Sequence, residues 1–157
     1  MVLSPKRILW PTDFSALSCH GALYARGFRD VFKAELHVIH VIPPLLTPDF
    51  AVTLPTEVPL AFSERDTLAA CRARLESLVT QQFGSAEGVV LDAFFGNPWS
   101  SICKYAQDAG IELVVVSTHG HTGLRHIVIG GTAERIVQHA PCPVLVVKNP
   151  EKDFVAA

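Results

Sequence analysis

The residues best suited to chemistry gather in one glycine-rich stretch, the run STHGHTG at 117–123, which is followed by Gly130, Gly131 and Thr132. Glycines let backbone N–H groups approach phosphate oxygens because no Cβ stands in the way. A helix starting near residue 131 would add unpaired N–H donors and a partial positive charge. This stretch therefore indicates an anion site of the kind that holds a di- or triphosphate.

A second candidate is Asp13, which follows the first apolar run of the chain. Its carboxylate could accept hydrogen bonds from a ribose or from an amino group at the same crevice. Two plainer roles stand beside these interpretations. Asp13 could cap the first helix together with Ser15, and Gly120 and Gly123 could simply be turn residues.

The histidines and cysteines give little support to a metal site. His119, His121 and His126 crowd together, but their spacing matches no metal-binding motif, so we expect surface or packing residues, of which His119 and His121 could contact phosphate. The four cysteines contain no CxxC pair and are expected to be buried free thiols: Cys19, Cys71, Cys103 and Cys142.

Motifs for covalent catalysis or phosphate-loop chemistry are absent from the sequence. It holds no Gly-x-Ser-x-Gly elbow, no Gly-x4-Gly-Lys-Ser/Thr loop, and no Gly-x-Gly-x2-Gly after the first strand. We therefore expect no catalytic residues.

Short apolar segments alternate with amphipathic ones along the chain. The predicted strands are Arg7–Pro11, Glu35–Ile42, Gly88–Phe95, Glu112–Thr118 and Pro143–Lys148, and the predicted helices cover 14–29, 64–82, 98–109 and 131–139. This alternation predicts an α/β fold: one doubly wound domain over residues 1–150, with a five-stranded, mainly parallel sheet and helices on both faces. Residues 151–157 are expected to form a C-terminal tail.

The segment 43–62 departs from this pattern because it contains five prolines and cannot form a regular helix. It is either a surface excursion between the second strand and its helix, or a lid or partner-binding segment. Its apolar residues indicate that it packs against something.

The overall composition favours a globular protein. The 157 residues are 49% hydrophobic and 18% charged, with a net charge of -2, which gives no reason to expect nucleic acid or an anionic membrane as a partner. No apolar stretch reaches the ~20 residues of a membrane-spanning helix, and the start lacks a signal peptide pattern. We therefore expect a cytoplasmic protein.

Three segments make the chain resemble the universal stress protein family over nearly its whole length. They are ILWPTDFS at 8–15, GNPW at 96–99 and ELVVVSTHGHTGLRHIVIGGTAERIVQHAPCPVLVVK at 112–148. The resemblance implies the strand order 3-2-1-4-5 and a homodimer paired through the last strand, Pro143–Lys148. Pairing an apolar edge strand is also physically sensible, because a bare one invites aggregation.

Nucleotide-binding members of this family carry a Gly-x2-Gly-x9-Gly-Ser/Thr motif. On this chain its positions fall on Ser117, Gly120, Gly130 and Gly131, so the first glycine and the final hydroxyl depart from the motif. Thr132, one place later, could supply that hydroxyl. A ligand-free dimeric interaction protein is therefore one alternative to a nucleotide-binding regulator. A weak ATPase that hydrolyses ATP slowly is the other.

The resemblance implies ATP, or else ADP or AMP, as the ligand, with any Mg²⁺ held by the phosphates. The site residues that it implies are Pro11, Thr12, Asp13, Val41, Val116, Ser117, His119, Gly120, Gly130, Gly131 and Thr132. It also implies a regulatory role in the stress response.

Overall fold

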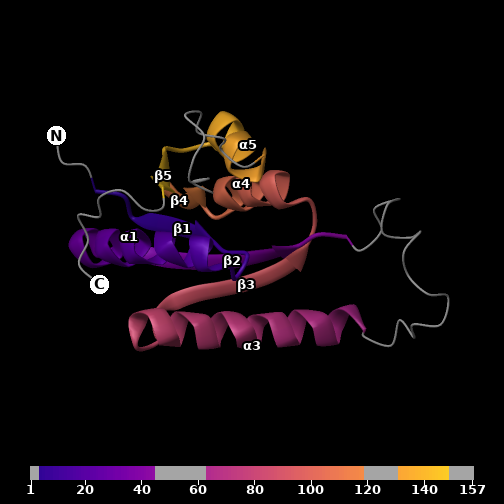
Figure 1. Cartoon of the computed structure of the whole chain (residues 1–157). Coiled ribbons are helices and arrows are strands. Elements are labelled where there is room, and N and C mark those ends of the chain that lie inside the picture. Colours follow the sequence, from indigo (N-terminus) through magenta and orange to yellow (C-terminus); the bar gives the residue numbers. More distant parts are fainter. Residues whose placement is uncertain (1–3, 45–62, 119–130, 149–157) are drawn as a thin grey trace, which may run out of the picture.

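The computed structural model describes residues 4–44, 63–118 and 131–148. Its elements are β1 (Arg7–Pro11), α1 (Ala16–Phe32), β2 (Glu35–Ile42), α3 (Glu64–Phe83), β3 (Val89–Phe95), α4 (Pro98–Asp108), β4 (Leu113–Thr118), α5 (Gly131–His139) and β5 (Val144–Lys148). All strands pair in parallel, in the order β3-β2-β1-β4-β5. The predicted α/β fold and strand order are confirmed (Figure 1).

The helices cover both faces of the sheet. On one face, α1 and α3 pack against the sheet through residues that include Ala22, Ala25, Leu75 and Val79. On the other face, α4 and α5 do so through Ile102, Ala106, Ala133 and Ile136. Parallel strands need crossover connections, and these connections place helices on the faces, so the central strands are buried on both sides.

Strand β1 shows the consequence most clearly, because Ile8, Leu9 and Trp10 are all fully buried at the centre of the sheet. Ile8 and Trp10 belong to the core under α1 and α3, whereas Leu9 belongs to the core under α4 and α5. The uninterrupted apolar run in the sequence thus reflects a strand that is covered twice.

Helix α1 differs from its prediction at both ends. It begins at Ala16 because Ser15 is the N-cap, and its side chain accepts a hydrogen bond from the Ser18 N–H. Phe14, predicted to be helical, has a φ of 64° and cannot belong to the helix. The helix ends at Phe32, where Lys33 takes a left-handed conformation and donates its N–H to the Arg29 carbonyl.

The caps of α3 and α4 agree with the sequence. Ser63 caps α3, its hydroxyl donates to the Asp66 carboxylate at 2.7 Å, and it accepts the Asp66 N–H at 3.1 Å. Asn97 caps α4, with Pro98 in its first turn. Gly110 follows the end of α4 with a φ of 62°, as expected for a glycine that stops a helix.

The remaining expectations concern the cysteines, the proline-rich segment, the tail and membrane-spanning helices. The four cysteines are free, but they are half-buried rather than buried, and burial raises the pKa of each thiol. Most of the proline-rich segment 43–62 and the tail 151–157 lie outside the described residues. None of the helices in the described ranges combines the length and apolar character needed to cross a membrane.

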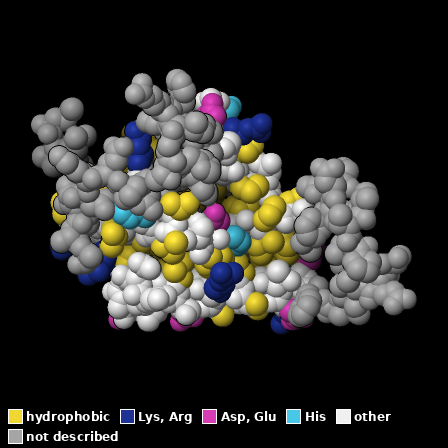
Figure 2. All heavy atoms as spheres, in the orientation of Figure 1, with side chains coloured by type: hydrophobic (Ala, Val, Ile, Leu, Met, Phe, Trp, Pro, Cys, Tyr) yellow, Lys and Arg dark blue, Asp and Glu magenta, His cyan; other side chains and the backbone are white. Residues whose placement is uncertain are grey.

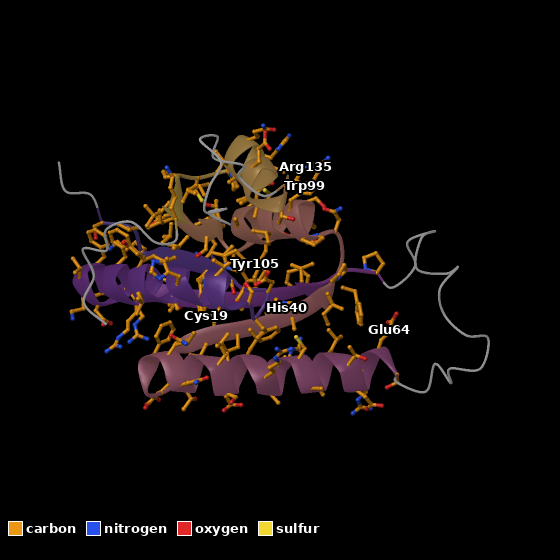
Figure 3. All side chains as sticks on the ribbon, viewed as in Figure 1. Cys19, His40, Glu64, Trp99, Tyr105 and Arg135 are labelled. Carbon is orange, nitrogen blue, oxygen red and sulfur yellow. The ribbon has the colours of Figure 1, made fainter. Side chains whose placement is uncertain are left out.

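The outer surface carries both signs of charge. On the face shown in Figure 2, acidic and basic side chains are scattered among hydrophobic ones. Trp99 of α4 lies beneath the guanidinium of Arg135 on α5, with 5.5 Å from Cζ to the ring centroid (Figure 3). This contact joins the two helices that cover the same face of the sheet.

Candidate functional site

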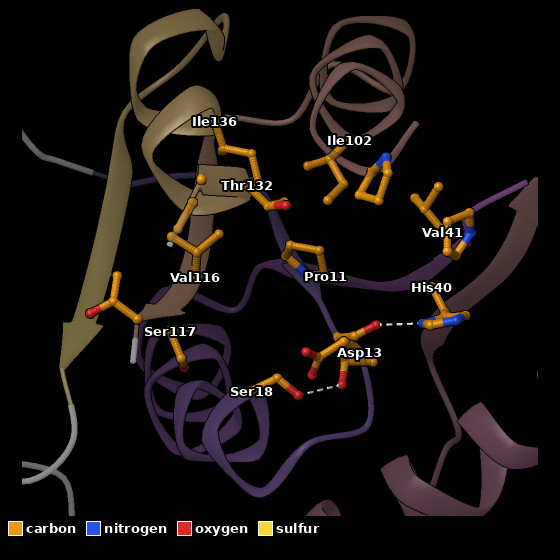
Figure 4. Close-up of a pocket in the computed structure, with 16 residues that line it drawn as sticks. Pro11, Asp13, Ser18, His40, Val41, Ile102, Val116, Ser117, Thr132 and Ile136 are labelled. Atoms are coloured by element: carbon orange, nitrogen blue, oxygen red, sulfur yellow. Dashed lines mark hydrogen bonds between the residues drawn. The ribbon is translucent and has the colours of Figure 1, made fainter. Parts of the chain in front are cut away.

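A cavity of about 380 Å³ opens where the strands end, on the side toward α4 and α5 (Figure 4). Open α/β sheets bind their ligands at the carboxyl ends of the strands, and small-molecule sites commonly measure some 300–1,000 Å³. The lining residues are Pro11, Thr12, Asp13, Ser18, His40, Val41, Pro43, Pro98, Ile102, Val116, Ser117, Thr118, Gly131, Thr132, Ala133 and Ile136.

The structure brings together most of the residues that were singled out from the sequence. Eight of them line this cavity: Pro11, Thr12, Asp13, Val41, Val116, Ser117, Gly131 and Thr132. The other three, His119, Gly120 and Gly130, lie outside the described residues, as do His121 and His126. Four stretches that are distant in the sequence therefore meet at one site.

The turn between β1 and α1 presents Asp13 at the rim. The Ser15 N–H donates to the Asp13 carboxylate at 2.9 Å, an Asx turn that leaves Ser15 itself as the cap of α1. The Thr12 hydroxyl beneath it meets the Ser18 hydroxyl at 2.8 Å. Asp13 thus supports the helix start, but its exposed carboxylate also faces the cavity.

The surroundings of Asp13 favour the ionised form of its carboxyl group. Partial burial by itself raises the pKa of this carboxyl, but hydrogen bonds from Ser15 and Ser18 outweigh that effect, so its pKa lies below the usual range. Asp13 is therefore ionised at neutral pH and acts purely as a hydrogen-bond acceptor. Hydroxyl and amino groups of a ligand are its natural partners.

The inner walls of the cavity are apolar. Val41 and Val116 are buried at the ends of β2 and β4, and Ile102 and Ile136 close the space from α4 and α5. Figure 4 shows Pro11 of β1 between Val116 and Val41, with Ile102 and Ile136 above them. Such walls suit the faces of a flat ring, while the polar groups at the rim fix its orientation.

The first turn of α5 also borders the cavity. Gly131, Thr132 and Ala133 line it, so the N–H groups that a helix start leaves without intrahelical partners lie beside the cavity, where they would suit an anion. A Cβ built on Gly131 would meet no described atom within 4 Å. None of the described lining residues is Lys or Arg, so in this part of the chain the helix terminus is the main positive element.

Ser117 stands where the family motif has its first glycine, yet its side chain does not fill the cavity. Figure 4 shows it pointing toward α1, where a Cβ added to Gly21 would lie 2.7 Å from the Ser117 Oγ. The serine is thus accommodated by a glycine on the neighbouring helix. The Oγ atoms of Ser117 and Thr118 are buried and have no hydrogen-bond partner among the described residues.

Several lining residues were not among the predicted site residues. Ser18 could have been found from its place three residues after the cap Ser15, and His40 from its place beside Val41. Pro98 follows the end of the third strand, a position that the sheet rule favours. Ile102 and Ile136 carry no local signal, because only the packing of α4 and α5 brings them to the cavity.

Comparison with known proteins identifies a matching family and several relatives of this chain. Residues 5–148 match the universal stress protein family. Universal stress protein MJ0531 of Methanocaldococcus jannaschii is 31% identical over 148 residues, which cover 94% of this chain and 85% of the relative. Universal stress protein MJ0577 of the same organism is 26% identical over 154 residues, which cover 92% and 95%.

Solved structures share the fold. The structure of MJ0577 superposes with a TM-score of 0.71 at 24% identity and covers 96% of this chain and 100% of the other. A universal stress protein in complex with cAMP superposes with a TM-score of 0.62 at 14% identity and covers 94% and 100%. From its family match and its 31% identity to MJ0531, this chain belongs to the universal stress protein family.

Proposed function

We propose that this protein binds ATP, or the related nucleotides ADP or AMP, and acts as a regulatory module in the stress response. The observation that carries the proposal is the convergence of three features on one cavity: the Asp13 carboxylate, apolar walls and the start of α5. The carboxylate suits ribose hydroxyls, the walls suit the adenine ring, and the helix terminus suits phosphate. Any Mg²⁺ would be held by the phosphates of the nucleotide.

Two further points support an adenine nucleotide. The departure at Ser117 leaves the cavity open, because the side chain is accommodated beside Gly21 on α1. A universal stress protein of the same fold has been solved in complex with cAMP, which is itself an adenine nucleotide. The departure at Gly131 removes a hydroxyl but leaves the backbone N–H in place.

The proposal includes a homodimer that pairs through β5. This strand lies at the edge of the sheet, and Val144, Leu145 and Val146 are only half-buried in the single chain. A second copy would cover them. We expect Val146→Lys to yield a monomer by sedimentation, and Val90→Lys on the opposite edge strand β3 to leave the mass unchanged; a monomeric wild type would contradict the dimer.

Titration calorimetry with ATP, ADP and AMP tests the ligand. We expect saturable binding that Asp13→Ala weakens on the order of 100-fold, because hydrogen bonds to a charged group are each worth about 1.5–3 kcal/mol. Val90→Lys, far from the cavity, serves as the control that binds like wild type. An absence of heat with all three nucleotides at millimolar concentration would overturn the ligand claim.

Two alternatives have their own signatures in these experiments. A ligand-free interaction protein would form the β5 dimer and bind no nucleotide. A weak ATPase would turn over labelled ATP, and Asp13→Ala would abolish that turnover.

A further inference from the structure

The turn that carries Asp13 is held in place from outside by residues of two other elements. Thr12 is buried, with 5% of its surface exposed, while Asp13 next to it is exposed at the rim of the cavity. The Thr12 N–H donates to the Ile39 carbonyl on β2 at 2.9 Å. The direction in which the Asp13 carboxylate points therefore depends on how this short turn is fixed.

His40 of β2 provides one contact. Its Nδ1 lies 2.7 Å from the Thr12 carbonyl oxygen, as the dashed line in Figure 4 marks. A carbonyl oxygen can only accept a hydrogen bond, so Nδ1 carries a proton and donates it. The imidazole thereby ties the peptide just before Asp13 to the neighbouring strand.

Phe14 provides the second contact, from the other side of Asp13. Its φ of 64° lies in the left-handed region, which is unfavourable for a bulky residue and persists only where the surroundings enforce it. Its ring lies between two partners: the His40 ring at 4.6 Å between centroids, and the Arg74 guanidinium at 4.1 Å from Cζ to centroid. Arg74 belongs to α3, so three separate elements meet here.

We propose that His40, Phe14 and Arg74 form a clamp that positions Asp13 by fixing the Thr12–Phe14 turn against β2 and α3. The importance of this clamp for a ligand rests on the proposed function, because the ligand senses it only through Asp13. The clamp also ties the nucleotide site to α3, the helix that follows the proline-rich segment in the chain.

The Ser15 amide reports the state of the turn without any ligand. Its N–H donates to the Asp13 carboxylate, so its hydrogen exchange slows only while the turn keeps its shape. We expect His40→Ala and Phe14→Ala each to speed this exchange at pH 7 by about tenfold, the equivalent of one lost hydrogen bond. The Cys19 N–H, which donates to the Ser15 carbonyl within α1, should keep its rate and so separate local loosening from unfolding.

Two arginines on α3 provide a matched pair. Arg74→Met removes the cation from the Phe14 ring, whereas Arg72→Met removes a cation that instead pairs with Asp92 at 2.9 Å. Both side chains are exposed, so neither change should unfold the protein. We expect faster Ser15 exchange in Arg74→Met and an unchanged rate in Arg72→Met; equal rates in all four variants and wild type would overturn the clamp.

Calorimetry with ATP then separates the clamp from the proposed function. We expect His40→Ala and Phe14→Ala to weaken ATP binding by about tenfold, and Arg72→Met to leave it unchanged. Faster Ser15 exchange with unchanged ATP affinity would overturn the role of the clamp in positioning Asp13 for a ligand. A wild type that binds no nucleotide would defeat the proposed function, while the exchange rates would still decide whether the clamp exists.

Discussion

The polar groups at the two ends of the sheet differ in their hydrogen-bond partners. At the amino end, His37 is buried and both of its ring nitrogens have partners: Nδ1 lies 2.9 Å from the Tyr105 hydroxyl and Nε2 lies 2.8 Å from the Glu35 carboxylate. Arg7 lies 3.5 Å from the same carboxylate. Burial raises the pKa of Tyr105, and the carboxylates of Asp92 and Glu35 add to the effect, so its hydroxyl stays protonated.

At the carboxyl end, polar groups face a cavity or lack a partner. The exposed Asp13 carboxylate and the first turn of α5 line the cavity, and the buried Ser117 and Thr118 hydroxyls have no partner in the described part of the chain. A polar group paired inside the protein stabilises the fold, whereas one left toward a cavity is available to a ligand. We therefore expect the paired groups at the amino end to contribute mainly to stability, and the groups around the cavity to contact a ligand under the proposed function.

The largest expected effect is on stability, and it comes from removing His37 at the amino end. His37→Ala deprives the Tyr105 hydroxyl and the Glu35 carboxylate of a partner and leaves a void, so we expect a loss of about 2–3 kcal/mol in the free energy of unfolding. Urea denaturation measures this loss. The affinity for ATP should stay within about twofold of wild type; a tenfold loss would show that the two ends are not separate.

The contact between α1 and β4 is the next test. Gly21→Ala places a methyl group against the Ser117 hydroxyl, and we expect it to cost about 1–2 kcal/mol of stability because the core is overpacked there. Ser117→Gly in the same chain should restore most of that loss, as measured by urea denaturation of both single variants and the double variant. Strictly additive effects would mean that the two residues do not share this space.

The charge of Asp13 makes a smaller, pH-dependent contribution to stability. Its lowered pKa means that the folded protein binds this proton less readily than the unfolded chain does. The contribution is therefore present above the ordinary pKa of 3.8 and is lost as the pH falls through the lowered value. The stability advantage of wild type over Asp13→Asn should shrink between about pH 5 and pH 2 in urea melts; an advantage that grew on acidification would contradict this sign.

The smallest expected effect is a change in ATP affinity at Gly131, which lines the cavity. Gly131→Ser returns the hydroxyl of the family motif, and no described atom lies within 4 Å of the added Cβ, so the fold should not change. We expect ATP to bind about threefold more tightly, the effect of one modest hydrogen bond. Gly131→Ala is the matched control that adds the Cβ without the hydroxyl, and an equal gain in both variants would rule out the hydroxyl as the cause.

Much of the fold could be predicted because its signals are local. The apolar run Ile8–Trp10 is typical of a strand buried on both faces, and Ser63 and Asn97 mark their helix starts by cap chemistry. The start of α1 was predicted two residues early because Phe14 gives no sign of its left-handed conformation. That conformation depends on the tertiary contacts with His40 and Arg74.

The candidate site, too, could be predicted from the sequence only in part. Asp13 could be found from its place after the first predicted strand, where ligands of open α/β sheets bind, whereas Val41 and Val116 came from the family resemblance. The pairing of Ser117 with Gly21 could not be predicted, because it joins a strand to a helix nearly a hundred residues away in the chain. The half-buried state of the cysteines likewise depends on how the helices pack.

Chemical-shift mapping during an ATP titration tests whether the nucleotide binds at the carboxyl end of the sheet. We expect the amides of Asp13, Val41, Val116 and Thr132 to shift in a saturable way, and those of Arg7, Glu35 and Glu112 at the amino end to stay in place. Shifts confined to the amino end, or no shifts at millimolar ATP, would contradict the assignment of binding to the carboxyl end.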